Sequence, residues 1–355
     1  MGISGRTMRL LVGTTVLVTA CNTGGATPTA TPKASGPAAT TAPAAATSAG
    51  TGTAEFKLRG ANAVGPNTSF GRAYETFADC LSTRTNGRVE LEIFHSATLG
   101  SDAEALELAQ TGALDFTETT IYSNVIKVGT VFDLPYLFND EEHWKKVTQG
   151  APGQVIKDAG IPSGIRILSF HLGGWRDTYG NKKISSAEDL KGMKLRTLQS
   201  PAYVQFFQAL GAVPTPLAFG EVYLALQQGT LDGAETALPS MYDAKHYEVS
   251  KYVAQTHHGL SSVAWVIAEA TWKKLPADIQ GVVVACDKEA TDQQITEQIA
   301  DATRIDKELQ EEKGIEFTKP DLEPLRAIAR DKVYTSLITE EGQKALLQQV
   351  IDLGK

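Results

Sequence analysis

Residues 186–236 read SAEDLKGMKLRTLQSPAYVQFFQALGAVPTPLAFGEVYLALQQGTLDGAET and decide the fold. Short apolar segments alternate here with segments whose apolar residues recur at helical spacing. The pattern predicts strands at 194–197 and 231–234, and helices at 203–210 and 221–228, each helix followed by a glycine. Strand, helix and returning strand are typical of an α/β sheet, so we expect a fold of the α/β class.

Arg196 is the candidate binding residue of this stretch, because it lies near the end of the strand at 194–197. Ligands of α/β sheets collect beyond the carboxyl ends of the strands. A guanidinium there offers a planar pair of donors that matches a carboxylate. On chemistry alone an ordinary surface salt bridge stays open as the alternative, since most arginines lie at the surface.

The chain resembles the DctP-type solute-binding proteins of TRAP transporters (tripartite ATP-independent periplasmic transporters). The resemblance covers the chain from Glu55 onward. Each motif alone would be weak, but six in register are strong. In order they are GALD at 112–115, LPYLF at 134–138, DLKGMKLR at 189–196, EVYLALQQG at 221–229, DGAE at 232–235 and YEV at 247–249.

The resemblance implies a two-lobe fold like that of periplasmic binding proteins, with one long helix spanning both lobes. The helical pattern at 277–313 fits that helix, because at ~1.5 Å per residue it reaches ~50 Å. We expect the solute-binding domain to occupy residues 55–355. Its lobe I would comprise about 55–173 and 262–301, and its lobe II about 174–261 and 302–355.

The resemblance also implies a ligand site around Arg196. In family members a second arginine precedes the carboxylate-binding arginine at the spacing that Arg176 has here, and a ligand asparagine follows at the position of Thr236. Threonine offers a hydroxyl and no amide, so this departure bears on specificity. Phe219 lies where the family often has an aromatic residue facing the ligand. A surface position for Arg176 and core packing for Phe219 stay open.

Three further residues complete the predicted site. Glu118 lies at the carboxyl end of the strand predicted within 114–119, in a region that contacts ligand in the family, although a structural carboxylate is an equal alternative. Trp175 is a candidate apolar wall or a core residue. Asn67 precedes the helix at 70–83, where backbone N–H groups and a side-chain amide suit a polar ligand group. Capping of that helix by Asn67 or the two residues after it is the alternative.

The N-terminus predicts export and anchoring. Residues 1–20 carry Arg6 and Arg9 before a mostly apolar run, which is typical of a signal peptide. The sequence VTAC at 18–21 resembles a bacterial lipobox, in which Cys21 becomes the lipidated first residue; a plain secretory signal is the alternative. Residues 21–54, rich in Ala, Thr, Pro and Gly, predict a tether. We expect a lipid-anchored protein on the periplasmic or extracytoplasmic face of a bacterial membrane.

Charge and cysteine content narrow the partners further. The chain has a formal net charge of −8, and leaving out Arg6, Arg9 and Lys33 gives −11 for the domain. Such a domain is a poor partner for nucleic acid, and contact with a membrane is expected only through the anchor. Cys80 and Cys286 are the cysteines of the domain. An exported protein can pair them, but we expect two buried free thiols.

The motifs of common enzymes are missing from the sequence. It contains no G-x-S-x-G, no G-x-x-x-x-G-K-[ST] and no C-x-x-C. His257 and His258 are adjacent, so alternate faces of a strand would separate their rings, and we expect no metal. No cofactor is expected either. No pair of carboxylates stands out for acid–base chemistry.

The sequence therefore predicts a receptor, not an enzyme. It would capture a small organic acid between two lobes and present it to the membrane subunits of a TRAP transporter. A secreted α/β enzyme acting on a carboxylate, a receptor of an ATP-driven importer and a structural lipoprotein are the alternatives. An enzyme would convert its ligand into a product. A receptor of an ATP-driven importer would have similar lobes but not the quoted motifs, and a structural lipoprotein would bind no small molecule.

Overall fold

The computed structural model describes residues 54–355. These residues belong to one compact unit, which runs from Gly50 to Lys355. The predicted signal peptide, Cys21 and almost all of the predicted tether lie outside the described residues. Among the described residues, no helix is both long and apolar enough to cross a membrane.

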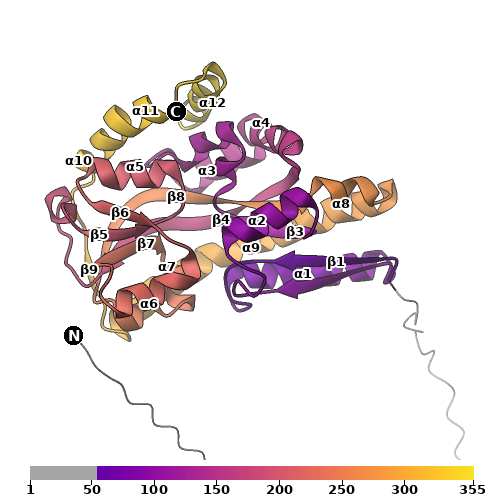
Figure 1. The fold of residues 1–355 in the computed structure, drawn as a ribbon, viewed down its shortest axis with the longest axis horizontal. Helices are drawn as coiled ribbons and strands as arrows, with labels where there is room; N and C mark the ends of the chain where they lie inside the picture. Colours follow the sequence, from indigo (N-terminus) through magenta and orange to yellow (C-terminus); the bar gives the residue numbers. More distant parts are fainter. Residues whose placement is uncertain (1–53) are drawn as a thin grey trace, which may run out of the picture. The chain divides into compact units, whose positions relative to one another are not determined.

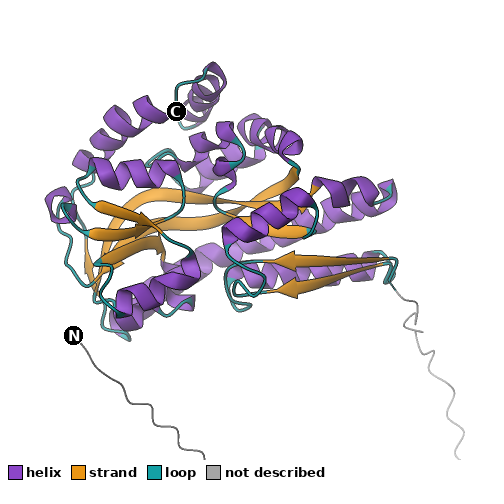
Figure 2. Cartoon of the chain, in the orientation of Figure 1, coloured by secondary structure: helices purple, strands orange, loops and turns teal. Residues whose placement is uncertain are grey.

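The described chain is built on one mixed sheet of nine strands in the order β2-β1-β3-β8-β4-β7-β5-β6, with β9 paired to β8. Helices lie on both of its faces (Figure 2). The predicted α/β class is thus confirmed. The strands are β1 (Phe56–Ala61), β2 (Val89–Phe94), β3 (Phe116–Thr119), β4 (Ile165–Gly180), β5 (Lys194–Thr197), β6 (Val213–Pro216), β7 (Gly233–Ala237), β8 (Tyr252–Ala268) and β9 (Glu316–Thr318).

Helices alternate with single strands from β1 to α2 and from β5 to α7, and elsewhere two or three helices follow one another (Figure 1). The two helices predicted within residues 186–236 are α5 and α6, one or two residues from their expected bounds. The helices are α1 (Ser69–Arg84), α2 (Asp102–Thr111), α3 (Glu141–Gln149), α4 (Ala151–Gly160), α5 (Pro201–Ala209), α6 (Val222–Gln227), α7 (Leu238–Asp243), α8 (Glu269–Lys274), α9 (Ala277–Glu311), α10 (Glu323–Ile328), α11 (Thr335–Leu337) and α12 (Glu341–Leu353).

Helix α9 is the predicted long helix. It has 35 residues and packs against α1, β4 and α7, so it contacts elements of both predicted lobes (Figure 1). Two buried glutamines fix it to β4. Gln294 bonds to the backbone N and O of Leu172, and Gln298 donates to the backbone O of Gly173.

Strands β4 and β8 run antiparallel along most of their length and connect the two ends of the sheet. Their pairing is interrupted where Arg176 pairs with Gly259 but Thr178 pairs with Ala254. Between these pairs β4 contributes one residue and β8 contributes residues 255–258, which we call the β8 bulge. The bulge is held by Asp177, whose Oδ1 accepts from the backbone N of His257 at 2.8 Å.

The largest core cluster extends along the sheet. It joins Ile156 and Ile165 on one side to Leu195 and Phe206 on the other. The motif at 134–138 contributes Leu134, Leu137 and Phe138 to this cluster. The lobe boundaries themselves stay a prediction.

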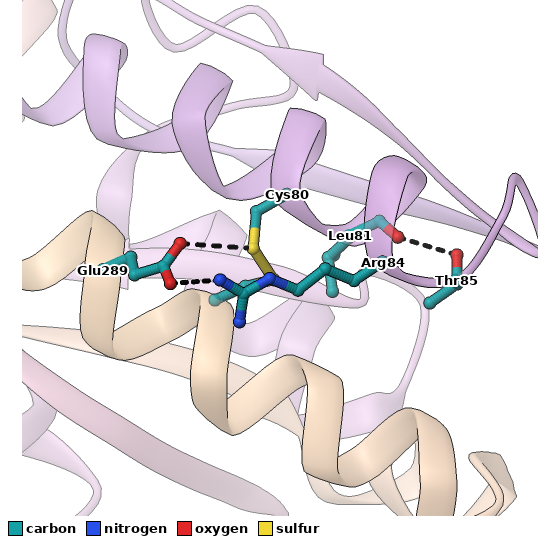
Figure 3. The surroundings of a disulfide bond; sticks show 6 residues. Cys80, Leu81, Arg84, Thr85 and Glu289 are labelled. Carbon is teal, nitrogen blue, oxygen red and sulfur yellow. Dashed lines mark hydrogen bonds and ion pairs between the residues drawn. A yellow bond between two sulfur atoms is a disulfide. The ribbon is translucent and has the colours of Figure 1, made fainter.

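Cys80 and Cys286 form a disulfide that joins α1 to α9 (Figure 3). The expectation of two free thiols was wrong. The residues are 206 positions apart, yet their Cα atoms are 5.7 Å apart because α1 and α9 pack side by side. Next to the disulfide, Arg84 forms an ion pair with Glu289 of α9.

Candidate functional site

A cavity of about 100 Å³ lies between the ends of several strands and the first turns that follow them. Five of the seven predicted ligand residues line it. They come from β3, β4, β5, β7 and the turn before α6, so separate parts of the sequence converge here. They are Glu118, Arg176, Arg196, Phe219 and Thr236.

Arg196 lies at the carboxyl end of β5 and is 2% exposed. Its Nε donates to the backbone O of Leu217 at 2.9 Å, and its Nη1 to the backbone O of Glu235 at 3.3 Å. Its Nη2 has no hydrogen-bond partner within residues 54–355. The ring of Phe219 lies 5.8 Å from the guanidinium carbon. The backbone bonds thus fix the guanidinium and leave its outer edge for a ligand.

Arg176, on β4, is held in a similar way. Its Nε donates to Oε2 of Glu235 at 2.6 Å, and its Nη2 to the backbone O of Glu235 at 3.2 Å. The guanidinium lies 5.2 Å from the ring of Tyr203. The alternative of a surface arginine is wrong for both Arg176 and Arg196, because each is buried.

Glu235 is the buried carboxylate that joins the two arginines. It accepts from Arg176, from the backbone N of Leu198 at 2.6 Å and from His258 at 3.3 Å, and lies 3.8 Å from Arg196. Burial alone would raise the pKa of Glu235, but Arg176 and His258 outweigh it and lower this pKa to about 2. The cations Arg176 and Arg196 and the anion Glu235 together carry one net positive charge, which one ligand carboxylate would balance.

The opposite wall of the cavity is acidic. Asp102 accepts from the backbone N and the hydroxyl of Thr120 through Oδ2, at 3.1 and 2.8 Å. Glu118 accepts from Nδ1 of His171 at 2.6 Å or donates to it. Burial raises the pKa values of both carboxyl groups.

Two buried polar atoms on this wall lack partners in the described part of the chain. They are Oδ1 of Asp102, an acceptor, and Nδ2 of Asn62, a donor. Oδ1 of Asn62 is occupied, because it lies 3.2 Å from Nδ1 of His95. Such orphaned groups are costly unless a ligand or water satisfies them. A ligand hydroxyl, which both donates and accepts, would satisfy either atom.

Sequence reasoning missed Asn62, Asp102 and Glu235. Asn62 directly follows β1, so its position at a strand's carboxyl end was an available signal. Asp102 begins α2 and carries no signal of its own. Glu235 belongs to the motif at 232–235, but only its contacts reveal a role.

Thr236 lines the cavity, and the residue as a whole is 4% exposed. Its hydroxyl makes no hydrogen bond with another residue of the described chain. The hydroxyl of Thr236 is therefore free to form a hydrogen bond with a ligand oxygen beside the arginines.

Trp175 lies away from this cavity. It is next to Arg176 on β4, and neighbouring residues of a strand point to opposite faces. Its Nε1 donates to Glu141 at 2.7 Å, and its ring lies 5.7 Å from that of His257. Trp175 lines a second cavity, together with His257.

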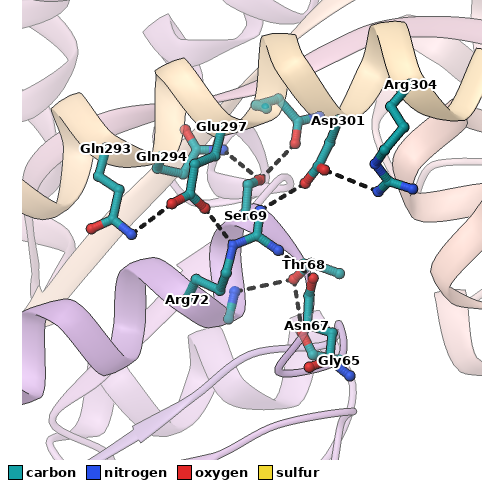
Figure 4. Close-up of polar contacts among 12 residues, drawn as sticks. Gly65, Asn67, Thr68, Ser69, Arg72, Gln293, Gln294, Glu297, Asp301 and Arg304 are labelled. Atoms are coloured by element: carbon teal, nitrogen blue, oxygen red, sulfur yellow. Dashed lines mark hydrogen bonds and ion pairs between the residues drawn. The ribbon is translucent and has the colours of Figure 1, made fainter.

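Asn67 is not among the residues that line the ligand cavity. Its backbone O accepts from Arg72, which also pairs with Asp301 of α9 at 2.7 Å (Figure 4). The cap of α1 is Thr68, whose hydroxyl accepts from the backbone N of Gly71 at 3.0 Å. The capping alternative is thus confirmed for Thr68, the neighbour of Asn67. Asn67 itself contributes a backbone contact with Arg72.

The cavity is narrow because segments on its two sides touch. The backbone N of Gly65 donates to Oδ2 of Asp243 on α7 at 3.0 Å. Nδ2 of Asn124 donates to the backbone O of Gln199 at 3.0 Å. In the predicted division these bonds join lobe I to lobe II, and they hold the two sides of the cavity together in the described conformation.

A sheet shared by two lobes, with buried arginines at strand ends around a cleft, defines the class of two-lobe solute-binding proteins. Comparison gives the family. Residues 60–340 match the model of the bacterial extracellular solute-binding proteins, family 7, or DctP. The chain belongs to this family and is a DctP-type TRAP solute receptor, not an enzyme. Members of the family act outside the cytoplasm.

Three relatives illustrate the match. The C4-dicarboxylate-binding periplasmic protein DctP of Rhodobacter capsulatus is 33% identical over 242 residues, 66% of this chain and 72% of the relative. The structure of a Roseobacter denitrificans TRAP solute-binding protein with bound L-galactonate has a TM-score of 0.81 at 30% identity, covering 84% and 100% of the two chains. One from Chromohalobacter salexigens with bound D-glucuronate has a TM-score of 0.80 at 27% identity, covering 83% and 99%.

Proposed function

We propose that this receptor captures a hydroxylated monocarboxylate, a sugar acid of the aldonate or uronate kind, between its two lobes. The observation that carries the proposal is the polarity of the cavity. One wall holds a single net positive charge, and the other holds carboxyl groups and orphaned hydrogen-bonding atoms. A ligand with one carboxylate and several hydroxyls complements both walls.

The carboxylate end would bind at the arginines. Arg196 offers Nη2 and the second hydrogen of Nη1, which lie side by side and suit two carboxylate oxygens. Arg176 would assist through Nη1, since Glu235 and its backbone occupy its other nitrogens. The hydroxyl of Thr236 would donate to the same carboxylate, and Phe219 would cover the ring or chain of the ligand.

The hydroxyl end would bind at the acidic wall. A ligand hydroxyl donates to Oδ1 of Asp102, another accepts from Nδ2 of Asn62, and Glu118 is a further partner. A second carboxylate on the ligand would instead meet two acidic groups, and like charges in a buried site cost several kcal/mol, of the order of a thousandfold in affinity. The sugar acids held by two solved relatives support this choice; the Rhodobacter relative is named for dicarboxylates.

Delivery to a membrane transporter completes the proposed function. Ligand contacts on both walls would stabilise the closed cleft, which is a hinge motion of the two lobes. We place the lobes at about 55–173 with 262–301, and 174–261 with 302–355. The family supports the membrane subunits of a TRAP transporter as the partner for the closed form.

We also propose that the mature chain is anchored by lipid at Cys21 after removal of residues 1–20. The support is the sequence VTAC at 18–21 and the tether-like composition that follows it. In bacterial cells, the full chain should sediment with membranes and the Cys21→Ser chain should not. Equal distribution of both chains between membrane and soluble fractions would contradict the anchor.

A thermal-shift screen of the soluble chain beginning at Asn22 tests the ligand class. The panel holds galactonate, glucuronate, galacturonate, succinate, 2-oxoglutarate, glucose and glutamate. A ligand at a hundred times its Kd adds ~2.7 kcal/mol to the stability of the folded state. We expect shifts with sugar acids that vanish in Arg196→Ala. A shift with succinate alone, or with glucose alone, would contradict the proposal.

A further inference from the structure

A second cavity, of about 620 Å³, lies on the other face of β4 and β8. Trp175 and His257 line it, while their chain neighbours Arg176 and His258 belong to the ligand site. Residues after η2 (Lys127–Asp133) and from the last helices complete its wall, among them Tyr136. We call it the rear cavity.

Aromatic side chains form part of the wall of the rear cavity. The hydroxyl of Tyr136 donates to the backbone O of Thr256 at 3.0 Å, and that of Tyr334 to the backbone O of Pro135 at 2.8 Å. Because these hydroxyls are already bonded, the tyrosines present their rings. The indole of Trp175 adds a third ring. Such walls suit a flat apolar group.

The rear cavity also holds an uncommitted cation. The guanidinium of Arg326 lies 5.6 Å from the ring centroid of Tyr136 and pairs with no carboxylate of residues 54–355. The other cations of the wall are engaged: Arg330 with Glu323 at 2.9 Å, and Lys355 with Asp352 at 2.7 Å. An anionic group beside an aromatic ring would therefore meet Arg326.

Two residues of the wall have strained backbones. Tyr136 has φ of 60° and His257 has φ of 40°, both in the left-handed region that residues other than glycine rarely adopt. Strain of this kind persists where the surrounding structure imposes it, and it gathers at binding sites and hinges. Both residues sit where the β8 bulge meets the motif at 134–138, since the backbone N of Tyr136 donates to the backbone O of His258 at 3.0 Å.

We propose that the rear cavity is a second ligand site, which takes a small aromatic carboxylate and is coupled to the cleft. The aromatic ring would stack on Trp175 and Tyr136, and the carboxylate would bind Arg326. An occupant that moves Trp175 or His257 also moves Arg176 or His258, because each pair is adjacent in the chain. Both of these neighbours bind Glu235.

The sign of the coupling depends on which conformation the occupant prefers. The rear cavity is present in the conformation in which the bonds from Gly65 to Asp243 and from Asn124 to Gln199 hold the two sides of the ligand cavity together. We take the occupant to bind this conformation more tightly than one in which those bonds are broken, so it raises the affinity for the sugar acid. By linkage, the sugar acid raises the affinity for the rear ligand by the same factor. The coupling rests on the proposed function, whereas binding to the rear cavity does not.

Calorimetric titration with 2-naphthoate, as the probe, tests binding. Arg326 is exposed, so we expect Arg326→Ala to weaken it about three- to tenfold, the effect of losing a charge-assisted contact that solvent screens in part. Arg330→Ala is the matched control and should change the affinity less than about twofold, since an exposed ion pair contributes little. Arg196→Ala should leave 2-naphthoate binding intact. Circular dichroism and unfolding curves verify that each variant is folded.

Three results would overturn the proposal. They are absence of 2-naphthoate binding at millimolar concentration, loss of binding in Arg196→Ala with Arg326→Ala unaffected, and equal losses in the Arg326 and Arg330 variants. A second titration, with galacturonate in the presence of saturating 2-naphthoate, should show tighter binding than without it. Unchanged or weaker binding overturns the coupling. The two proposals can fail separately. If no sugar acid binds, but Arg326→Ala weakens 2-naphthoate binding and Arg330→Ala and Arg196→Ala do not, then the proposed function is wrong and the rear cavity is still a ligand site.

Discussion

Arg176 and Glu235 form an ion pair of 2.6 Å whose two side chains are 5% and 0% exposed. Arg196 lies 3.8 Å from the other oxygen of the same carboxylate. Glu235 is thus the anion that permits two arginines to be buried side by side. A buried charge that loses its partner is strongly destabilising. The ligand site and the stability of the fold therefore depend on the same carboxylate.

Glu235→Gln should destabilise the protein by about 3–5 kcal/mol at pH 7, measured by urea unfolding. The pKa of Glu235 is lowered from 4.5 to about 2 in the folded protein. The resulting stability, of the order of 3 kcal/mol, is present above about pH 4.5 and is lost as the pH falls toward 2. The variant should lack this acid dependence. Glu188→Gln, which removes an exposed partner of Lys191, is the control; equal losses in both variants would contradict the prediction.

Arg196→Ala should weaken binding of the sugar acid by ~2–5 kcal/mol, about thirty- to several-thousand-fold, in a calorimetric titration. Arg196→Lys should also bind the sugar acid weakly, because an ammonium group cannot supply two coplanar donors. Arg304→Lys is a matched control, since Arg304 is half exposed and pairs with Asp301 and Glu308 on α9. Near-native affinity in Arg196→Lys would rule out the assigned carboxylate contact.

Asp133→Asn should change how stability varies with pH. Oδ2 of Asp133 accepts from the hydroxyls of Ser123 and Ser200 at 2.6 and 2.7 Å, and burial raises its pKa from 3.8 to about 6. Between these values the folded protein keeps a proton that the unfolded chain releases. Stability therefore falls by about 3 kcal/mol as the pH rises from 4 to 6. The stability of the Asp133→Asn variant should not fall over this pH range. If unfolding free energy plotted against pH is parallel for the two proteins, the prediction is contradicted.

Removing the disulfide should lower the free energy of unfolding. The loop of 206 residues between Cys80 and Cys286 corresponds to about 5 kcal/mol in the chain-entropy description, and measured values are usually ~2–4 kcal/mol. Urea unfolding of the oxidised protein, the reduced protein and the double serine variant provides the comparison. The reduced protein should match the variant, and dithiothreitol should leave the variant unchanged. A reductant without effect on the natural chain would show that the bond is not formed.

The sequence predicted much of the fold because local patterns determine it. The strand at 194–197 and the helix at 277–313 appear as β5 and α9, within two residues at the helix end. Periodicity and glycines fix such elements without knowledge of distant partners. The disulfide could not be predicted, because it depends on how α1 packs against α9.

The site was predictable where a strand end carried a charged residue, as with Arg196, or where the resemblance supplied a spacing, as with Arg176. The end of a strand marks the position of Asn62, but the lack of partners for its Nδ2 and for Oδ1 of Asp102 depends on tertiary contacts that no local pattern reveals. Trp175 is different. Only the structure shows that β4 continues through Trp175 and Arg176, and alternation along the strand then places Trp175 on the face opposite Arg176.

The continuity of β4 and β8 has a mechanical consequence. A receptor whose lobes are joined by loose segments swivels freely, whereas here a two-stranded ribbon joins them. Bending a ribbon of paired strands meets resistance along its length, and this resistance is weakest where the register shifts: between Ile167 and Ser169, between Leu172 and Gly174, and most of all at the β8 bulge. Helix α9 packs along the same ribbon, so a change in the angle between the lobes must bend the ribbon and the helix together.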